Sequence, residues 1–436
     1  IKMLIKKILI IIYTFALNSH LYAQQSEYEQ LFNEFWNSTN TQDAEAGIDE
    51  IIESGISFDE AYQVLHTGKV YELAETGVVL RSYAAADGTE YFYHLNVPEN
   101  YDPSRKYPVR FELHGGLGGR TSNEPGGRES RDNGRTRLEG AEQIYIMPYA
   151  SINQPWWDVS QVENIREILD LVKREYNVDE DRVVLGGISD GGTGAWYVAM
   201  HENTRFASFY SFIGYTMVLA NPSISDGTSY LHNLLGKSWY AINGGRDRLY
   251  PTSRVTPFIT YLQTKGIDID YHPLRNGEHN TRWWPEWRDN FEDFVASHPR
   301  ESNPASISWK AAQGSNMRSH WLVIEEVDFE KVSPIPLFEV GVDPADGSTV
   351  LTMDEAGRVD LVREGNNIQA ISDGVGSFRL LLSPDVIDFS QIVTITVNND
   401  VEFQGILEPS LVTLLSWAAK DNDRQMLYAA EVLIEL

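Results

Sequence analysis

Short apolar runs alternate with segments of helical periodicity along the middle of this chain. The patterns predict strands at 109–113, 143–148, 182–185, 208–213, 239–243 and 269–273, and helices at 162–176, 193–201 and 257–264. Strands that alternate with helices form a parallel sheet whose two faces are covered by those helices. The sequence therefore predicts an α/β domain, placed at 76–299 and opened by a β-hairpin around Asp87-Gly88.

The segments on either side of this domain follow other patterns. Apolar residues recur at helical spacing within 24–75, which predicts an N-terminal helical cap. Residues 300–436 read instead as short strands with one helix near 411–419, which predicts a small β-rich C-terminal domain built as a sandwich. A length of 436 residues agrees with two or three domains.

Residues 1–23 have the character of a secretory signal peptide. Three lysines precede an apolar run from Ile8 to Leu17, and Ala23 stands before the expected cleavage point. The run is shorter than the ~20 residues that a membrane-spanning helix needs. We therefore expect a secreted or periplasmic protein that has no stable membrane association once this segment is removed.

Charge and composition exclude several classes of function. A formal net charge of −28 repels phosphate backbones, so nucleic acid is not an expected partner. The absence of cysteine rules out disulfides, thiolate catalysis and cysteine-ligated metals. The spacings typical of zinc sites, calcium loops and dinucleotide-binding loops are also missing. The sequence therefore predicts neither a metal nor a cofactor.

One glycine-flanked serine stands where a nucleophile would be expected. Residues Gly187–Gly191 read G-x-S-x-G and lie between the predicted strand at 182–185 and the helix at 193–201. Such a strand-to-helix turn exposes the serine hydroxyl, and small neighbours let the backbone turn tightly. The helix N-terminus behind it favours developing negative charge. We predict that Ser189 is the nucleophile.

An acid and a base should follow the serine, each in a loop after a parallel strand. Asp247 comes shortly after the predicted strand 239–243 and is the preferred acid, with Asp226 in reserve. Among the ten histidines, His279 lies in a glycine-containing loop just past the last predicted strand. A serine nucleophile, a histidine base and an aspartate that orients the imidazole form the expected triad.

The oxyanion of the reaction would be bound by backbone N–H groups from two places. Asp190, directly after the nucleophile, supplies the first. The second is expected from the segment His114-Gly115-Gly116 after the strand 109–113, with Gly116 preferred and Gly115 close behind.

These motifs together resemble the α/β-hydrolase superfamily. The similarity is to its secreted esterases of the polyhydroxybutyrate depolymerase-like and feruloyl-esterase-like groups, and it extends over about 90–295. It is carried by His114–Gly116, by Val178-Asp179 with Arg182–Val184, by Gly187–Trp196, and by Asp247 and His279. The resemblance implies the α/β-hydrolase fold, the triad and ester hydrolysis. It does not extend to the C-terminal domain.

The expected function is therefore carboxylic ester hydrolysis by a secreted serine hydrolase, on small aryl or alkyl esters or on esters linked to polysaccharide. Trp157 and Trp284 are candidate substrate-binding residues, because aromatic side chains near a triad can form an apolar pocket or stack on a ring. Both can equally be core residues. Two alternatives stay open: a serine peptidase of the same superfamily, and a carbohydrate-binding scaffold protein.

Overall fold

A computed structural model describes residues 28–38, 41–122, 124, 136, 138–221, 224–225, 229–328, 330 and 356–436. The predicted signal peptide and the reserve acid Asp226 lie outside these residues. The chain divides into two compact units, which are described separately. The larger comprises residues 71–407 and 431–436, and the smaller comprises the N-terminal residues up to Val70 together with 408–430.

The larger unit contains an eight-stranded sheet that confirms the predicted α/β-hydrolase fold. Its strand order is β1-β2-β4-β3-β5-β6-β7-β8. The strands are β1 (Gly77–Ala84), β2 (Glu90–Val97), β3 (Tyr107–Leu113), β4 (Ile144–Pro148), β5 (Val178–Ile188), β6 (Ser208–Phe212), β7 (Ser238–Gly244) and β8 (Asp268–Leu274). The hairpin β1–β2 is antiparallel and β2 joins β4 antiparallel, whereas the strands from β4 through β8 run parallel. The carboxyl ends of β3, β5, β7 and β8 therefore meet at one edge, where the functional loops begin.

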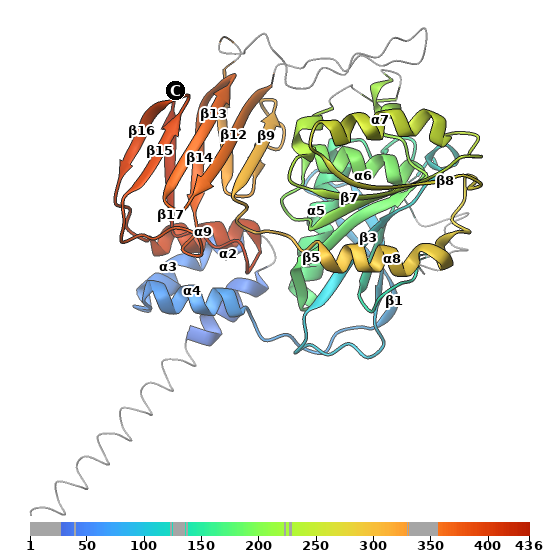
Figure 1. Ribbon diagram of the computed structural model, residues 1–436. Helices are drawn as coiled ribbons and strands as arrows, with labels where there is room; N and C mark the ends of the chain where they lie inside the picture. Colours follow the sequence, from blue (N-terminus) through green and yellow to red (C-terminus); the bar gives the residue numbers. More distant parts are fainter. Residues whose placement is uncertain are drawn as a thin grey trace, which may run out of the picture. The chain divides into compact units, whose positions relative to one another are not determined.

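Helices cover both faces of this sheet (Figure 1). One face packs on α5 (Val159–Glu175), α6 (Asp190–His201) and α7 (Thr252–Thr264), and the other on α8 (Trp284–Ser297). Residues alternate between the two faces along each strand, so that Phe209 belongs to the first core and Tyr210 to the second. The fully buried Arg110 of β3 holds α8 through an ion pair of 2.7 Å with Glu292. The helix α8 is not among the predicted elements.

Residues 306–435 contribute two further sheets, which confirms the predicted β-rich region. A five-stranded sheet has the order β16-β15-β13-β12-β9 and a four-stranded sheet has the order β10-β11-β14-β17. The strands are β9 (Ser306–Ala311), β10 (Arg318–Ser319), β11 (Leu322–Val327), β12 (Gly357–Glu364), β13 (Asn367–Asp373), β14 (Val375–Leu382), β15 (Val393–Val397), β16 (Asp400–Gly405) and β17 (Ala430–Glu435). The two sheets contact each other through β9, β11, β12 and β14, as in a sandwich.

A buried asparagine joins this sandwich to the α/β core. The Asn233 side chain accepts the Lys310 N–H on β9 at 2.7 Å and donates to the Lys310 carbonyl at 2.8 Å. It also donates to the Met200 carbonyl in α6 at 2.7 Å. The Asn233 side chain thus links the sandwich to α6, the helix that begins directly after the candidate nucleophile.

The smaller unit is helical. Residues 28–37, α2 (Thr41–Ala46), α3 (Ile48–Glu53) and α4 (Phe58–Thr67) pack with α9 (Leu411–Asp421) around one apolar core. A capping box between Ser57 and Glu60 starts α4. The boundaries predicted at 75/76 and 299/300 stay predictions, but α9, which they assign to the C-terminal domain, groups here with the N-terminal helices. Among the described residues, no helix is both long enough and apolar enough to cross a membrane.

Candidate active site

Ser189 lies at the tip of a tight turn between β5 and α6. Its backbone has φ 57° and ψ −117°, a region that non-glycine residues rarely adopt. Glycine at position 191 is required because a side chain there would collide with the Leu113 carbonyl of β3. The turn is therefore pressed against the end of the neighbouring strand, which places the Ser189 hydroxyl at the carboxyl edge of the sheet.

The other two predicted triad residues form a continuous series of hydrogen bonds with this hydroxyl. Ser189 Oγ lies 2.8 Å from His279 Nε2, and His279 Nδ1 lies 2.7 Å from Asp247 Oδ2. A carboxylate oxygen only accepts, so Nδ1 carries the imidazole proton and Nε2 is free to accept one from Ser189. The arrangement has the polarity that a serine nucleophile and its base require.

Backbone contacts fix the acid and the base relative to each other. The loops after β7 and β8 are joined by a hydrogen bond of 2.8 Å from the Arg246 N–H to the Gly277 carbonyl. The Asp247 side chain is 0% exposed, and its Oδ1 accepts the N–H groups of Leu249 at 2.7 Å and Tyr250 at 3.0 Å. With Oδ1 occupied in this way, only Oδ2 faces His279.

The predicted oxyanion-binding segment lies beside Ser189. A side chain on Gly115 would come within 2.8 Å of Ser189 Cβ and 2.7 Å of the Ile188 carbonyl, so the loop approaches the nucleophile as closely as glycine permits. Gly116 has φ 76° and ψ 38°, a left-handed conformation that favours glycine. It precedes the short 3₁₀ turn Leu117–Gly119.

The side chain of His114 holds this loop in place, a role that the sequence did not indicate. Its Nε2 accepts the Ala150 N–H at 3.1 Å, so its proton is on Nδ1 and is donated to the Gly115 carbonyl at 3.1 Å. Desolvation lowers the pKa of His114 to about 3, which keeps the ring neutral. Trp156 adds a third bond, from Nε1 to the His114 carbonyl at 2.8 Å. His114 is therefore a structural support of the loop and not a second base.

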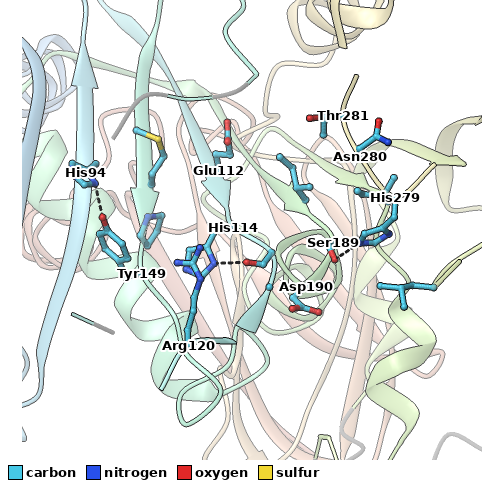
Figure 2. Close-up of a pocket in the computed structure, with 17 residues that line it drawn as sticks. His94, Glu112, His114, Arg120, Tyr149, Ser189, Asp190, His279, Asn280 and Thr281 are labelled. Carbon is cyan, nitrogen blue, oxygen red and sulfur yellow. Dashed lines mark hydrogen bonds between the residues drawn. The ribbon is translucent and has the colours of Figure 1, made fainter. Parts of the chain in front are cut away.

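A cleft of about 590 Å³ opens above these groups (Figure 2). Ser189, His279, Gly115, Gly116 and Asp190 line it, together with side chains from strands on the β2 side of the sheet. Figure 2 shows the additional polar groups on one side of Ser189; they are His94, Glu112, Arg120 and Tyr149. The other end is lined by Leu249, Asn280 and Thr281. The polar lining comes from four separate segments, so no local pattern could have identified it.

One ring contact lies in a wall of the cleft, and a second lies beside the triad. Tyr149 and His94 are hydrogen-bonded through the phenolic oxygen and Nδ1 at 2.9 Å, and desolvation lowers the pKa of His94. The Tyr250 ring, which is not among the residues that line the cleft, lies edge-on to His279 with centroids 5.8 Å apart. Burial, aided by the carboxylates of Asp190 and Asp247, raises the pKa of Tyr250 to about 12, so this phenol stays neutral.

The two tryptophans proposed as substrate-binding residues are not among the residues that line the cleft. Trp284 is 6% exposed and packs in the core between the sheet and α8, with Nε1 donating to the Glu139 carbonyl at 3.1 Å. Trp157 is half-buried, and its Nε1 donates to the Ile224 carbonyl at 2.8 Å. Trp284 begins α8, and its side chain faces the sheet because the first turn of that helix packs there.

Across the described part of the chain, no three His, Asp or Glu side chains are grouped closely enough to hold a metal ion. The chemistry available in the cleft is that of a hydroxyl nucleophile, an oriented imidazole and backbone N–H donors.

Comparison with known proteins places this domain in a family. A family model described as "Putative esterase" matches residues 86–304, half of the chain. A bifunctional acetylxylan esterase/xylanase of Neocallimastix patriciarum is 24% identical over 133 residues, which are 30% of this chain and 19% of that protein. The chain thus spans only about a fifth of that relative.

Among solved structures, a thermostable esterase has 18% identity and a TM-score of 0.41 over 51% of this chain and 63% of its own. A ferulic acid esterase of Anaeromyces mucronatus has 15% identity and a TM-score of 0.40 over 52% and 94%. The family match includes the Ser189 turn and the loops that carry Asp247 and His279. The chain therefore belongs to this family of esterases, which are carboxylic ester hydrolases.

Proposed function

We propose that this protein is a secreted serine hydrolase that cleaves carboxylic esters through an acyl-enzyme intermediate on Ser189. The observation that carries the proposal is the series from Ser189 Oγ to His279 Nε2 at 2.8 Å and from His279 Nδ1 to Asp247 Oδ2 at 2.7 Å. It joins three loops at one sheet edge and ends inside the cleft. Secretion is proposed from the sequence of residues 1–23 alone.

The reaction follows from the proton positions. Ser189 Oγ attacks the acyl carbon while His279 Nε2 takes the hydroxyl proton, and the carbonyl oxygen becomes an oxyanion. The N–H groups of Gly116 and Asp190 bind that oxyanion. When the tetrahedral intermediate collapses, the bond from acyl carbon to alcohol oxygen breaks and His279 returns the proton to the departing alcohol.

Deacylation repeats the same steps with water as the nucleophile. His279 takes a proton from the water, the hydroxide attacks the acyl carbon, and the carboxylic acid leaves as Ser189 recovers its proton. Asp247 keeps the imidazole in the tautomer that both half-reactions need.

The cleft favours esters that carry hydroxyl groups. Because His279 must reach the alcohol oxygen, the alcohol lies at the end lined by Leu249, Asn280 and Thr281. The hydrogen-bonded pair of His94 and Tyr149 offers polar partners at the other end. The fungal relative is named a bifunctional acetylxylan esterase/xylanase, and the polar side chains of Asn280 and Thr281 at the alcohol end agree with esters linked to a polysaccharide.

The test is a substrate panel assayed with the wild type and Ser189→Ala. The panel contains p-nitrophenyl acyl esters, methyl ferulate, acetylated xylan and aminoacyl anilides. We expect turnover of esters and not of anilides, and a loss of up to about 10⁶-fold in kcat for Ser189→Ala with an unchanged melting temperature. Ester turnover that survives in Ser189→Ala above about one part in a hundred would disprove the assignment of the nucleophile.

A further inference from the structure

The two N–H donors of the oxyanion site come from segments far apart in the chain. The Asp190 N–H belongs to the first turn of α6, where helical N–H groups have no intrahelical acceptor. The Gly116 N–H belongs to the loop after β3. Among hydrogen bonds between described residues, neither group is a donor. Catalysis needs both to point at one oxygen atom, so some contact must fix one donor relative to the other.

The side chain of Asp190 makes such a contact. Its Oδ2 accepts the Leu117 N–H at 2.8 Å, across 73 residues of sequence. Leu117 directly follows Gly116. Asp190 therefore supplies the first donor through its backbone N–H. Its carboxylate binds the peptide group that follows the second donor, the Gly116 N–H.

We propose that the Asp190 carboxylate is a positioning group that holds the Gly116 N–H in the oxyanion site. The inference rests on the proposed function, because it requires Ser189 to form the oxyanion. It assigns to the side chain of Asp190 a role separate from that of its own N–H.

The rest of the loop shows why an anchor is needed at this point. Upstream, the loop is held by His114 through the Gly115 carbonyl, and Gly115 itself is pressed against Ser189. Gly116 has a left-handed backbone and no atoms within 4 Å of the position that a side chain would occupy, so no neighbour fills that side of the residue. The bond from Leu117 to Asp190 closes the loop on its downstream side.

A carboxylate at this position also has a cost. Negative charge next to a developing oxyanion is repulsive, so electrostatics alone would favour a neutral residue. Figure 2 shows the Asp190 carboxylate directed away from Ser189 and His279. An ionised acceptor binds an N–H group more strongly than a neutral one does, which offsets that cost.

The competing explanation is purely structural, because an acid in the first turn of a helix stabilises that helix. Asp158 provides a matched control: it starts α5, its Oδ1 accepts the Ser160 N–H at 2.9 Å, and it does not line the cleft. Asp190→Ala and Asp158→Ala remove comparable interactions from two helix starts, but only the first frees the oxyanion loop.

The experiment compares the full-length wild type, Asp190→Ala, Asp190→Asn and Asp158→Ala. It measures kcat and KM for p-nitrophenyl acetate, the inhibition constant of phenylboronic acid, and the melting temperature. The boronic acid forms a tetrahedral adduct on Ser189 Oγ whose oxygen occupies the oxyanion site, so its affinity reports the geometry of that site.

We expect Asp190→Ala to lower kcat by about 10- to 100-fold, less than the 10²- to 10³-fold for a deleted donor, because the Gly116 N–H is misplaced but present. KM should stay within about threefold, and boronate affinity should fall by the same factor as kcat/KM. Asp190→Asn should recover most of the loss, since its amide oxygen still accepts the Leu117 N–H. Asp158→Ala should keep wild-type kinetics.

Wild-type kcat and boronate affinity in Asp190→Ala would overturn the inference, and so would equal losses in Asp190→Ala and Asp190→Asn. If Asp190→Ala does not fold, Asp190→Asn decides alone: a loss of more than about tenfold contradicts the acceptor role. Failure of the proposed function is distinguishable, because activity would then persist in Ser189→Ala.

Discussion

Replacing Asp247 by asparagine should disable the site because the structure fixes which way the new amide must turn. Asp247 Oδ1 accepts two N–H groups, from Leu249 at 2.7 Å and Tyr250 at 3.0 Å, while Oδ2 faces His279. An asparagine that turned its NH2 group toward Leu249 and Tyr250 would oppose two donors, at a cost of about 1–3 kcal/mol for each unsatisfied group. Its oxygen therefore stays on those N–H groups and its NH2 faces His279.

The orientation of that amide reverses the tautomer of the imidazole. His279 Nδ1 can then only accept, so the proton moves to Nε2, where it blocks transfer from Ser189. The same change of tautomer in a serine protease costs about 10⁴-fold in kcat, which corresponds to roughly 5.5 kcal/mol at 1.36 kcal/mol per tenfold change. The amide occupies the same space as the carboxylate, so the fold should be retained.

The assay is steady-state hydrolysis of p-nitrophenyl acetate, with melting temperatures measured on the same samples. Asp270→Asn is the matched control, because Asp270 also pairs with a histidine, His272 at 3.0 Å on β8, but neither residue lines the cleft. Its kcat should stay close to wild type. An Asp247→Asn variant that keeps more than about a tenth of kcat would refute the tautomer argument. Loss of activity in Asp226→Asn instead would move the acid to the reserve candidate.

Four other substitutions have defined outcomes. Gly115→Ala should reduce kcat in the esterase assay by more than tenfold, because the new methyl group would meet the Ile188 carbonyl at 2.7 Å and displace the loop. For comparison, deletion of an oxyanion donor costs about 10²–10³-fold in kcat. Trp284→Ala should lower the free energy of unfolding by about 3–5 kcal/mol in urea titrations without a selective rise in KM, since the side chain is 6% exposed. Asn233→Ala should cost about 1–3 kcal/mol in the same titrations, because it unpairs buried backbone groups, with kcat preserved in the folded protein. Desolvation lowers the pKa of the buried Lys237 from 10.5 to about 7. Between these pH values the unfolded chain binds more protons than the folded one, so the free energy of unfolding should rise with pH. Lys237→Met should flatten that rise between pH 7 and pH 9.

The fold class and the proximity of the three candidate triad residues could be predicted because their signals are local. Each of Ser189, Asp247 and His279 follows an apolar run that becomes a parallel strand, namely β5, β7 and β8. Parallel strands bring such loops to one edge whatever the details of packing. The pairing distances of 2.8 Å and 2.7 Å then depend on loop contacts, such as the bond from Arg246 to Gly277, that no run of sequence specifies.

The role of the aromatic residues could not be predicted for a related reason. Trp284, Phe291 and Phe294 recur at helical spacing and form the buried face of α8. Before the direction of that helix is known, a tryptophan five residues after His279 is equally compatible with a wall of the cleft and with the core. The ion pair between the buried Arg110 and the partly buried Glu292 holds the helix in its direction, and its two members are 182 residues apart in the sequence.

Partners at long sequence separation account for what was missed elsewhere. The N-terminal helices share their core with α9, so Leu65 and Leu414 belong to one cluster although most of the chain lies between them. The strand β17 has a clear alternation of buried and exposed residues, but it is recognisable as part of a sheet only beside β14. Local periodicity predicts that a segment has a buried face, and not what covers it.

The small residues around the nucleophile extend beyond the five-residue motif for a physical reason. Gly191 allows the turn to approach the Leu113 carbonyl, which any motif of this kind requires. Gly194 has a different role: a side chain there would collide with Trp156. Since Trp156 donates its indole N–H to the His114 carbonyl at 2.8 Å, the space left by Gly194 lets one buried ring contact both α6 and the loop that carries Gly116. The helix that follows Ser189 and the loop of the proposed oxyanion donor Gly116 thus contact the same ring, and we expect a larger residue at position 194 to displace that ring.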